Sequence, residues 1–179
     1  MNIENNLMVF GSSLDFADNP RGFWEYINKN TSYDTCWVIK DKVMFELLNR
    51  KGINCVLEGS REAREIIEKA HYLITSSFDF AYNKRIGQIH IAAWHGFPLK
   101  VIGFFDSAAA SETYVKGLKV ITTQTDLITA TSRFSHITLS GMFSVDPHKV
   151  KETGYPRNDM MFNNNSKPKL KELLDTDIS

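Results

Sequence analysis

Short apolar runs alternate with amphipathic stretches along most of this chain, and this alternation limits the fold more than any other feature. Runs of this length fit buried strands, and the stretches between them have helical spacing. Strands that alternate with helices form βα units around a mostly parallel sheet. The sequence therefore predicts an α/β fold with a Rossmann-like sheet flanked by helices. The predicted strands are residues 7–10, 35–39, 54–57, 72–75, 89–94 and 120–123.

Residues that favour helix ends support this division. Candidate N-caps precede several of the amphipathic stretches, and Gly52 provides a left-handed stop. Pro20 is expected at the first position of its helix, because proline lacks the N–H that this position leaves unpaired. A late helix is expected to carry residues 127, 128, 131 and 134 on one face. The expected N-caps are Asn19, Asp41, Ser60 and Thr125, and Asp146 with Pro147 opens a further short helix.

Size and charge exclude several functional classes. The 179 residues suit one ordinary domain, and a hydrophobic content of 42% is enough for a core. Basic and acidic residues balance at 21 each, so no overall field attracts nucleic acid. No window is long and apolar enough to span a bilayer, and the first residues lack the pattern of a signal peptide. We expect a cytoplasmic protein in which Cys36 and Cys55, both in apolar runs, are buried free thiols.

The segment WHGFPLK (residues 94–100) directly follows an apolar run and contains the strongest candidate for chemistry. His95 falls where a strand is expected to end, Gly96 lets a ligand approach the backbone, and Lys100 offers a cation for a phosphate. A histidine between aromatic residues is equally often a packed ring with one hydrogen-bonded nitrogen. The segment by itself leaves both interpretations open.

A second segment, GYPRND (residues 154–159), favours the functional interpretation. It also follows a short apolar stretch and combines glycine and proline with a cation, Arg157. Open α/β sheets bind ligands at the carboxyl ends of their strands. Two such segments at expected strand ends therefore indicate one site, although Lys100 and Arg157 could equally be solvated surface cations.

With these two segments, the sequence resembles the CDP-glycerol glycerophosphotransferase family, the teichoic acid polymerases and primases of GT-B architecture. The resemblance extends from about Asp18 to Asp159 and departs from the family's run at Phe97, where the family has threonine. The missing hydroxyl bears on acceptor binding more than on the base. The resemblance implies that this chain is the N-terminal, acceptor-side half of a GT-B fold.

The resemblance also implies roles for individual residues. His95 would be the general base that takes the proton from an acceptor hydroxyl, and Gly96 would keep the turn open. Lys100 and Arg157 would bind phosphate, with Asp159 orienting Arg157. The implied reaction transfers glycerol phosphate from CDP-glycerol to a teichoic-acid-type polymer or lipid-linked acceptor and releases CMP.

No metal or cofactor is predicted. Alternation along the strand places His90 and His95 on opposite faces, and no Cys, Asp or Glu lies nearby at ligand spacing. Ser76 and Ser77 lack the glycine elbow of a serine hydrolase and receive no role.

The predicted domains are residues 1–162, a Rossmann-like N-terminal domain, and residues 163–179, a linker with a short helix that leads towards a donor-binding domain. The expected partners are CDP-glycerol, held by that other domain, and a lipid-linked polyol-phosphate acceptor. Peripheral contact with the cytoplasmic face of the plasma membrane and self-association are also expected. Two alternatives remain open: a non-catalytic module that binds polyol phosphate or a protein, and half of a ribitol-phosphate or sugar transferase.

Overall fold

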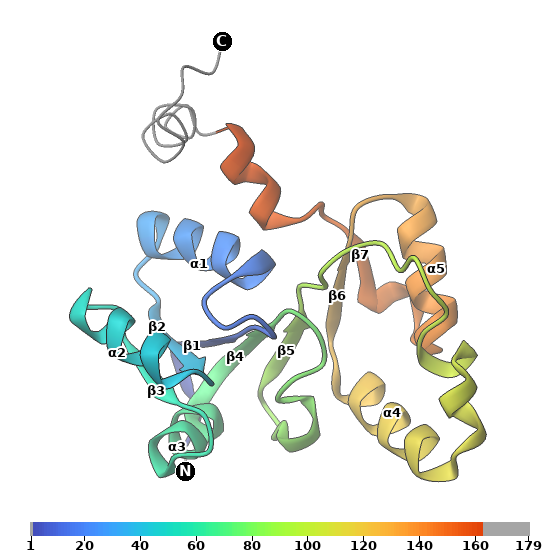
Figure 1. Cartoon of the computed structure of the whole chain (residues 1–179), viewed down its shortest axis with the longest axis horizontal. Coiled ribbons are helices and arrows are strands. Elements are labelled where there is room, and N and C mark those ends of the chain that lie inside the picture. The colour runs from blue at the N-terminus through green and yellow to red at the C-terminus, as the bar shows by residue number, and fades with distance from the viewer. Residues whose placement is uncertain (1, 163–179) are drawn as a thin grey trace.

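The computed structural model describes residues 2–162 and contains one sheet of seven strands, all of them parallel (Figure 1). The strand order is β3-β2-β1-β4-β5-β6-β7. Each strand after β1 is reached through a helical or irregular crossover, because a tight turn cannot join parallel strands. The strands are β1 (Glu4–Gly11), β2 (Asp34–Ile39), β3 (Cys55–Leu57), β4 (Ala70–Thr75), β5 (Ile89–Ala92), β6 (Leu127–Ala130) and β7 (Val150–Glu152).

Five α-helices cover the two faces of the sheet. Alternate residues of β1 point to opposite sides: Phe10 packs with α1 and α2, while Val9 packs with α3. Helices α4 and α5 pack against Ala92 and Ile128 on the face that α3 occupies, as right-handed crossovers demand. The helices are α1 (Asp18–Asn30), α2 (Lys42–Arg50), α3 (Arg61–Lys69), α4 (Glu112–Gln124) and α5 (Arg133–Phe143).

The first half of the chain follows the sequence expectations closely. The side chain of Asp41 accepts a hydrogen bond from the Met44 N–H, and that of Ser60 accepts one from the Ala63 N–H. Gly52 has the left-handed φ expected of a stop. Asn19 is an exception, because α1 begins at Asp18, two residues earlier than predicted, and Asn19 lies inside its first turn. Pro20 accordingly occupies a later position of that turn than predicted.

The predictions for residues 120–134 are wrong. Residues 120–123 belong to α4, where Leu118 and Thr122 are buried on one side, and residues 127–130 form strand β6 instead of a helix. Ser132, not Thr125, caps the helix that follows. The β-branched run from 120 to 123 favours a strand locally, but the packing of Ile121 and Thr122 against the core as one side of a helix overrides that preference.

The two cysteines are buried free thiols, as expected. Cys36 packs on the α3 side of the sheet and Cys55 on the α1 side, so the sheet separates them. Burial raises the pKa of Cys36 to about 12, which leaves almost no reactive thiolate at neutral pH.

Two further points concern the chain as a whole. Within residues 2–162 no helix has the length and apolar character needed to cross a membrane. The linker and short helix predicted for residues 163–179 lie outside the described residues.

The direction of chain progression reverses between β1 and β4. From β1 the chain winds outwards through β2 to β3, returns to β4, and then winds the other way. The loops after β1 and β4 consequently leave the sheet in opposite directions and open a crevice between them. This crevice at the carboxyl end of the sheet is where a ligand site is expected.

Candidate active site

The two sequence segments meet at this crevice. A cavity of about 560 Å³ opens there and takes its lining from loops far apart in the sequence. Its walls come from the loop after β1, the start of α1, and the loops that follow β4, β5 and β7. The lining residues are Ser13, Leu14, Asp18, Ser76, His95 and Arg157.

His95 is held with a defined ring orientation. Its Nδ1 lies 3.0 Å from the carbonyl oxygen of Ser76, and a carbonyl can only accept a hydrogen bond. Nδ1 must therefore carry a proton, so in the neutral ring the free lone pair is on Nε2. The ring also stacks on Trp94, with 4.4 Å between the centroids. This arrangement suits a general base that uses Nε2.

Arg157 is paired with an aspartate from the other end of the chain. Its Nη1 donates to Oδ1 of Asp18 at 2.5 Å, and its guanidinium lies 5.5 Å from the centre of the Tyr155 ring. Asp18 adopts a left-handed φ of 61°, which is uncommon outside glycine and is concentrated at functional sites. Asp159 is exposed in the 3-10 helix Pro156–Phe162, and the carboxylate that binds Arg157 in this structure is that of Asp18, so the orienting role of Asp159 stays a prediction.

Gly22 allows α1 to lie directly against the segment that carries Arg157. A Cβ built on Gly22 would stand 2.6 Å from the backbone nitrogen of Arg157 and 2.6 Å from the carbonyl carbon of Pro156. Both neighbours are main-chain atoms, so neither can rotate away. The absence of a side chain at Gly22 therefore fixes how closely Arg157 approaches α1.

We expect the substitution Gly22→Ala to lower the free energy of unfolding by roughly 1–3 kcal/mol, the usual cost of overpacking. Urea denaturation of the two proteins measures the difference. Gly141→Ala is the matched control, because Gly141 is also helical and its Cβ would meet only the Phe105 ring, at 4.0 Å. Equal effects of the two substitutions would contradict the close packing at Gly22.

Gly96 and Lys100 lie on the far side of His95. Both line a neighbouring cavity that His95 shares, and neither lines the cavity that contains Arg157. A Cβ on Gly96 would meet nothing within 4 Å, so the glycine leaves the space beside His95 open. Lys100 is exposed. Phe97, the departure from the family's run, stacks on Phe134 with 5.2 Å between ring centroids.

Three polar cavity residues were given no role from the sequence: Ser13, Asp18 and Ser76. The backbone N–H of Ser13 donates to Oγ of Ser76 at 3.0 Å, which joins the loops after β1 and β4. The available signal was positional: both serines directly follow strands on either side of the reversal in strand order. Recognising it requires the strand order, which the sequence does not display.

His90 takes no part in this site. It is fully buried, and its two ring nitrogens face the hydroxyls of Thr75 and Thr125 at 2.8 and 3.0 Å. Burial lowers its pKa to about 4, with Asp126 opposing the effect. Over residues 2–162 no cluster of three or more His, Cys, Asp or Glu side chains could hold a metal ion.

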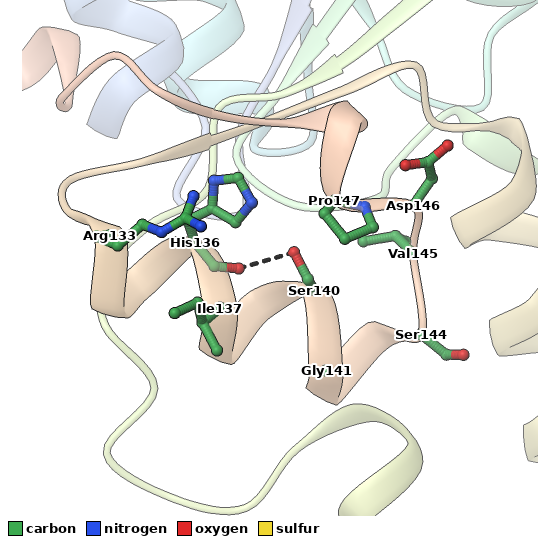
Figure 2. A pocket seen from close by; sticks show the side chains of 9 residues that line it. All are labelled: Arg133, His136, Ile137, Ser140, Gly141, Ser144, Val145, Asp146 and Pro147. Carbon is green, nitrogen blue, oxygen red and sulfur yellow. Dashed lines mark hydrogen bonds between the residues drawn. The ribbon is translucent and has the colours of Figure 1, made fainter.

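Another cavity of about 560 Å³ lies beside α5 (Figure 2). Arg133 and His136 lie at one end of it and Asp146 and Pro147 at the other, while the Ser140 hydroxyl donates to the His136 carbonyl. Nη1 of Arg133 and Nδ1 of His136 lie 3.6 and 3.4 Å from Oε1 of Glu152. The Arg133 charge is thereby offset, and the cavity contains none of the motif residues.

A known family matches almost the whole chain. Residues 1–177 match the family described as CDP-Glycerol:Poly(glycerophosphate) glycerophosphotransferase. The chain belongs to this family. The match includes both segments that meet at the cavity, and it confirms the resemblance seen in the sequence.

Curated relatives in the family are longer than this chain. A teichoic acid glycerol-phosphate transferase of Staphylococcus aureus is 27% identical over 165 residues, which are 87% of this chain and 42% of that protein. A teichoic acid poly(glycerol phosphate) polymerase of Staphylococcus epidermidis is 26% identical over 173 residues, which cover 90% of this chain and 23% of the relative. The chain thus spans less than half of either protein.

Solved structures confirm the fold. The wall teichoic acid polymerase TagF superimposes with a TM-score of 0.80 at 24% identity, over 96% of this chain and 44% of that one. A TagF variant soaked with CDPG gives a TM-score of 0.84 at 22% identity, over 99% of this chain and 46% of the other. The Rossmann-like architecture therefore corresponds to part of the GT-B polymerase fold.

Proposed function

We propose that this chain supplies the acceptor side of a glycerophosphotransferase. In the proposed reaction, glycerol phosphate passes from CDP-glycerol to a hydroxyl of a teichoic-acid-type polymer or a lipid-linked acceptor, and CMP is released. The observation that carries the proposal is the arrangement of His95, whose Nδ1 is bound by the Ser76 carbonyl and which shares one cavity with Arg157. Family membership and the names of the relatives supply the donor and the acceptor class.

The proposed chemistry needs one base and one source of positive charge. Nε2 of His95 takes the proton from the acceptor hydroxyl, and the oxygen forms a bond to the phosphorus that bears glycerol. The bond between that phosphorus and the bridging oxygen breaks, and CMP leaves with the electron pair. Arg157 stabilises charge on the phosphoryl oxygens, since its guanidinium has several donors and only one is directed at Asp18.

Lys100 is proposed to bind phosphate further along the acceptor. It lines the cavity on the other side of His95, and its ammonium is exposed to an incoming polyanion. Gly96 is proposed to leave room for the acceptor beside His95, because a Cβ there would stand in open space. Asp159 is proposed to contact the acceptor from the exposed side of the helix Pro156–Phe162.

The donor nucleotide is proposed to bind a domain other than residues 1–162, with residues 163–179 as the linker towards it. Support comes from the relatives, of which this chain covers less than half. A GT-B site lies between two domains, so residues 1–179 alone are expected to release no CMP. Donor choice would then depend on the other domain.

The deciding experiment incubates the complete natural protein with CDP-glycerol and a lipid-linked acceptor and measures CMP. Acceptor-dependent release supports the proposal, and parallel reactions with CDP-ribitol and a nucleotide sugar identify a different donor. If no donor yields product while calorimetry detects binding of a polyol phosphate, the chain is a non-catalytic binding module. His95-dependent CMP release by residues 1–179 alone would overturn the two-domain arrangement.

Several large apolar side chains near the site are exposed to solvent, where they could contact a second molecule or a membrane. Leu99 is 97% exposed, Phe105 62%, and Phe134 and Ile137 on α5 more than half. We propose that this surface mediates self-association and peripheral contact with the cytoplasmic face of the membrane. Light scattering over a concentration series should show that the mean mass rises with concentration, and Leu99→Ser should reduce this rise. A protein that stays monomeric and does not bind anionic vesicles would contradict the proposal.

A further inference from the structure

Asn19 is fully buried, and both ends of its side-chain amide are used. Its Nδ2 donates to the carbonyl oxygen of Trp94 at 2.6 Å, and its Oδ1 accepts from the backbone N–H of Arg157 at 3.2 Å. These partners lie 75 and 138 residues further along the chain. One side chain on α1 therefore connects the segment that carries His95 to the segment that carries Arg157.

The bond to Trp94 acts on the peptide that orients His95. Trp94 has a φ of 38°, a left-handed conformation that is unusual for a bulky residue and needs support from its surroundings. Asn19 binds the carbonyl of that same residue, which fixes the plane of the peptide between Trp94 and His95. The direction in which the His95 side chain leaves the backbone, and hence its reach to the Ser76 carbonyl, depends on this plane.

The hydrogen bond from Arg157 to Asn19 is one of three contacts that α1 makes with Arg157. Asn19 holds the main-chain nitrogen of Arg157, Asp18 holds its guanidinium, and Gly22 admits its backbone at close range. Three residues in the first turns of α1 thus fix both the backbone and the guanidinium group of Arg157. The separation between the base and the cation is then set by contacts with α1 as well as by the segments that carry them.

We propose that Asn19 is a positioning residue that fixes His95 and Arg157 relative to each other. It touches no reacting atom and acts through the two backbone groups that it binds. The proposal rests on the proposed function for its consequence in catalysis. Its structural part, the control of His95 orientation, stands independently of any activity.

The test compares Asn19→Leu with a matched control, Gln88→Met. Gln88 is also a buried amide that bridges backbone groups: its Nε2 donates to the carbonyls of Ile67 and Ala70 at 2.6 and 2.8 Å, and its Oε1 accepts from the Arg85 N–H. It lies before β5, at the opposite end of the sheet from the site. Each substitution removes a buried bridging amide, so a general loss of stability affects both variants.

The first readout is the ring tautomer of His95 by ¹⁵N NMR at a pH where the ring is neutral. The parent and Gln88→Met are expected to show one tautomer with the proton on Nδ1, whereas Asn19→Leu is expected to show the mixed population of a free imidazole. If a folded Asn19→Leu keeps the single tautomer, or if Gln88→Met loses it equally, the proposal is wrong. Should Asn19→Leu fail to fold, Asn19→Asp tests the same bond, because its carboxylate keeps the acceptor for the Arg157 N–H, loses the donor to the Trp94 carbonyl and adds a negative charge.

The second readout is CMP release by the complete natural protein. Asn19→Leu is expected to lower kcat by roughly tenfold or more, because misplacement of catalytic groups mainly slows the chemical step. Gln88→Met should retain the parental kcat. A parent protein without turnover would count against the proposed function alone, and the tautomer measurement would still decide the role of Asn19.

Discussion

Replacement of His95 by alanine is expected to lower the rate of glycerol phosphate transfer by roughly a hundredfold or more, the range typical of losing a general base. Among the residues that line the cavity, His95 is the one with an imidazole ring. CMP release under saturating donor measures the effect. Folding should be little affected because His95 is exposed, and the midpoint of thermal unfolding checks this.

His148→Ala is the control for this substitution. His148 is an exposed histidine that follows Pro147, away from the cavity, so its removal should leave the transfer rate unchanged. Near-normal turnover of a folded His95→Ala protein would contradict the role of base. His95 would then be a packed ring held by Ser76 and Trp94, the alternative that the sequence left open.

The stability of the protein is expected to fall steeply between pH 6.5 and pH 4 because of His90. Burial lowers its pKa from the ordinary 6.5 to about 4, so the unfolded chain binds more protons than the native state in this interval. The contribution of neutral His90 to the free energy of unfolding is therefore fully present above pH 6.5 and is lost as the pH falls towards 4. At about 1.4 kcal/mol for each pKa unit, the loss attributable to His90 is roughly 3 kcal/mol.

Urea denaturation at a series of pH values measures this dependence. His90→Gln removes the titrating ring and should flatten the curve between pH 6.5 and 4, whatever its stability at neutral pH. His148→Gln should leave the slope as it is, since His148 is exposed. A parent protein with equal stability at pH 7 and pH 4.5 would show that His90 has an ordinary pKa.

Local signals in the sequence were sufficient to predict a structural feature where one short-range interaction determines it. Asp41 and Ser60 cap helices because a short polar side chain before an amphipathic stretch has few other uses. The alternation of apolar residues along β5 correctly placed Ala92 and Ala93 on opposite faces of the sheet. These features depend on neighbours within a few residues, which the sequence displays directly.

Residues 120–130 show where local signals fail. A β-branched run became helix because Leu118 and Ile121 pack against the same core cluster, and residues three apart share a side of a helix but lie on opposite faces of a strand. The adjacent run 127–130 became a strand because β5 and β7 supply hydrogen-bond partners on its two sides. Both outcomes depend on surfaces brought from elsewhere in the chain, and intrinsic preference is too weak to resist them.

The sequence by itself determined the parallel α/β architecture, the family, and the two segments that contain His95 and Arg157. Only the tertiary structure decided how those residues work together. The Ser76 carbonyl selects the His95 tautomer, Asp18 binds the guanidinium of Arg157, and Asn19 connects the two segments. All three follow from the reversal of strand order between β1 and β4, which gathers loops from both ends of the chain at one edge of the sheet. A hydrogen bond between residues 139 positions apart leaves no periodicity or spacing to read, because its geometry exists only after the sheet has formed.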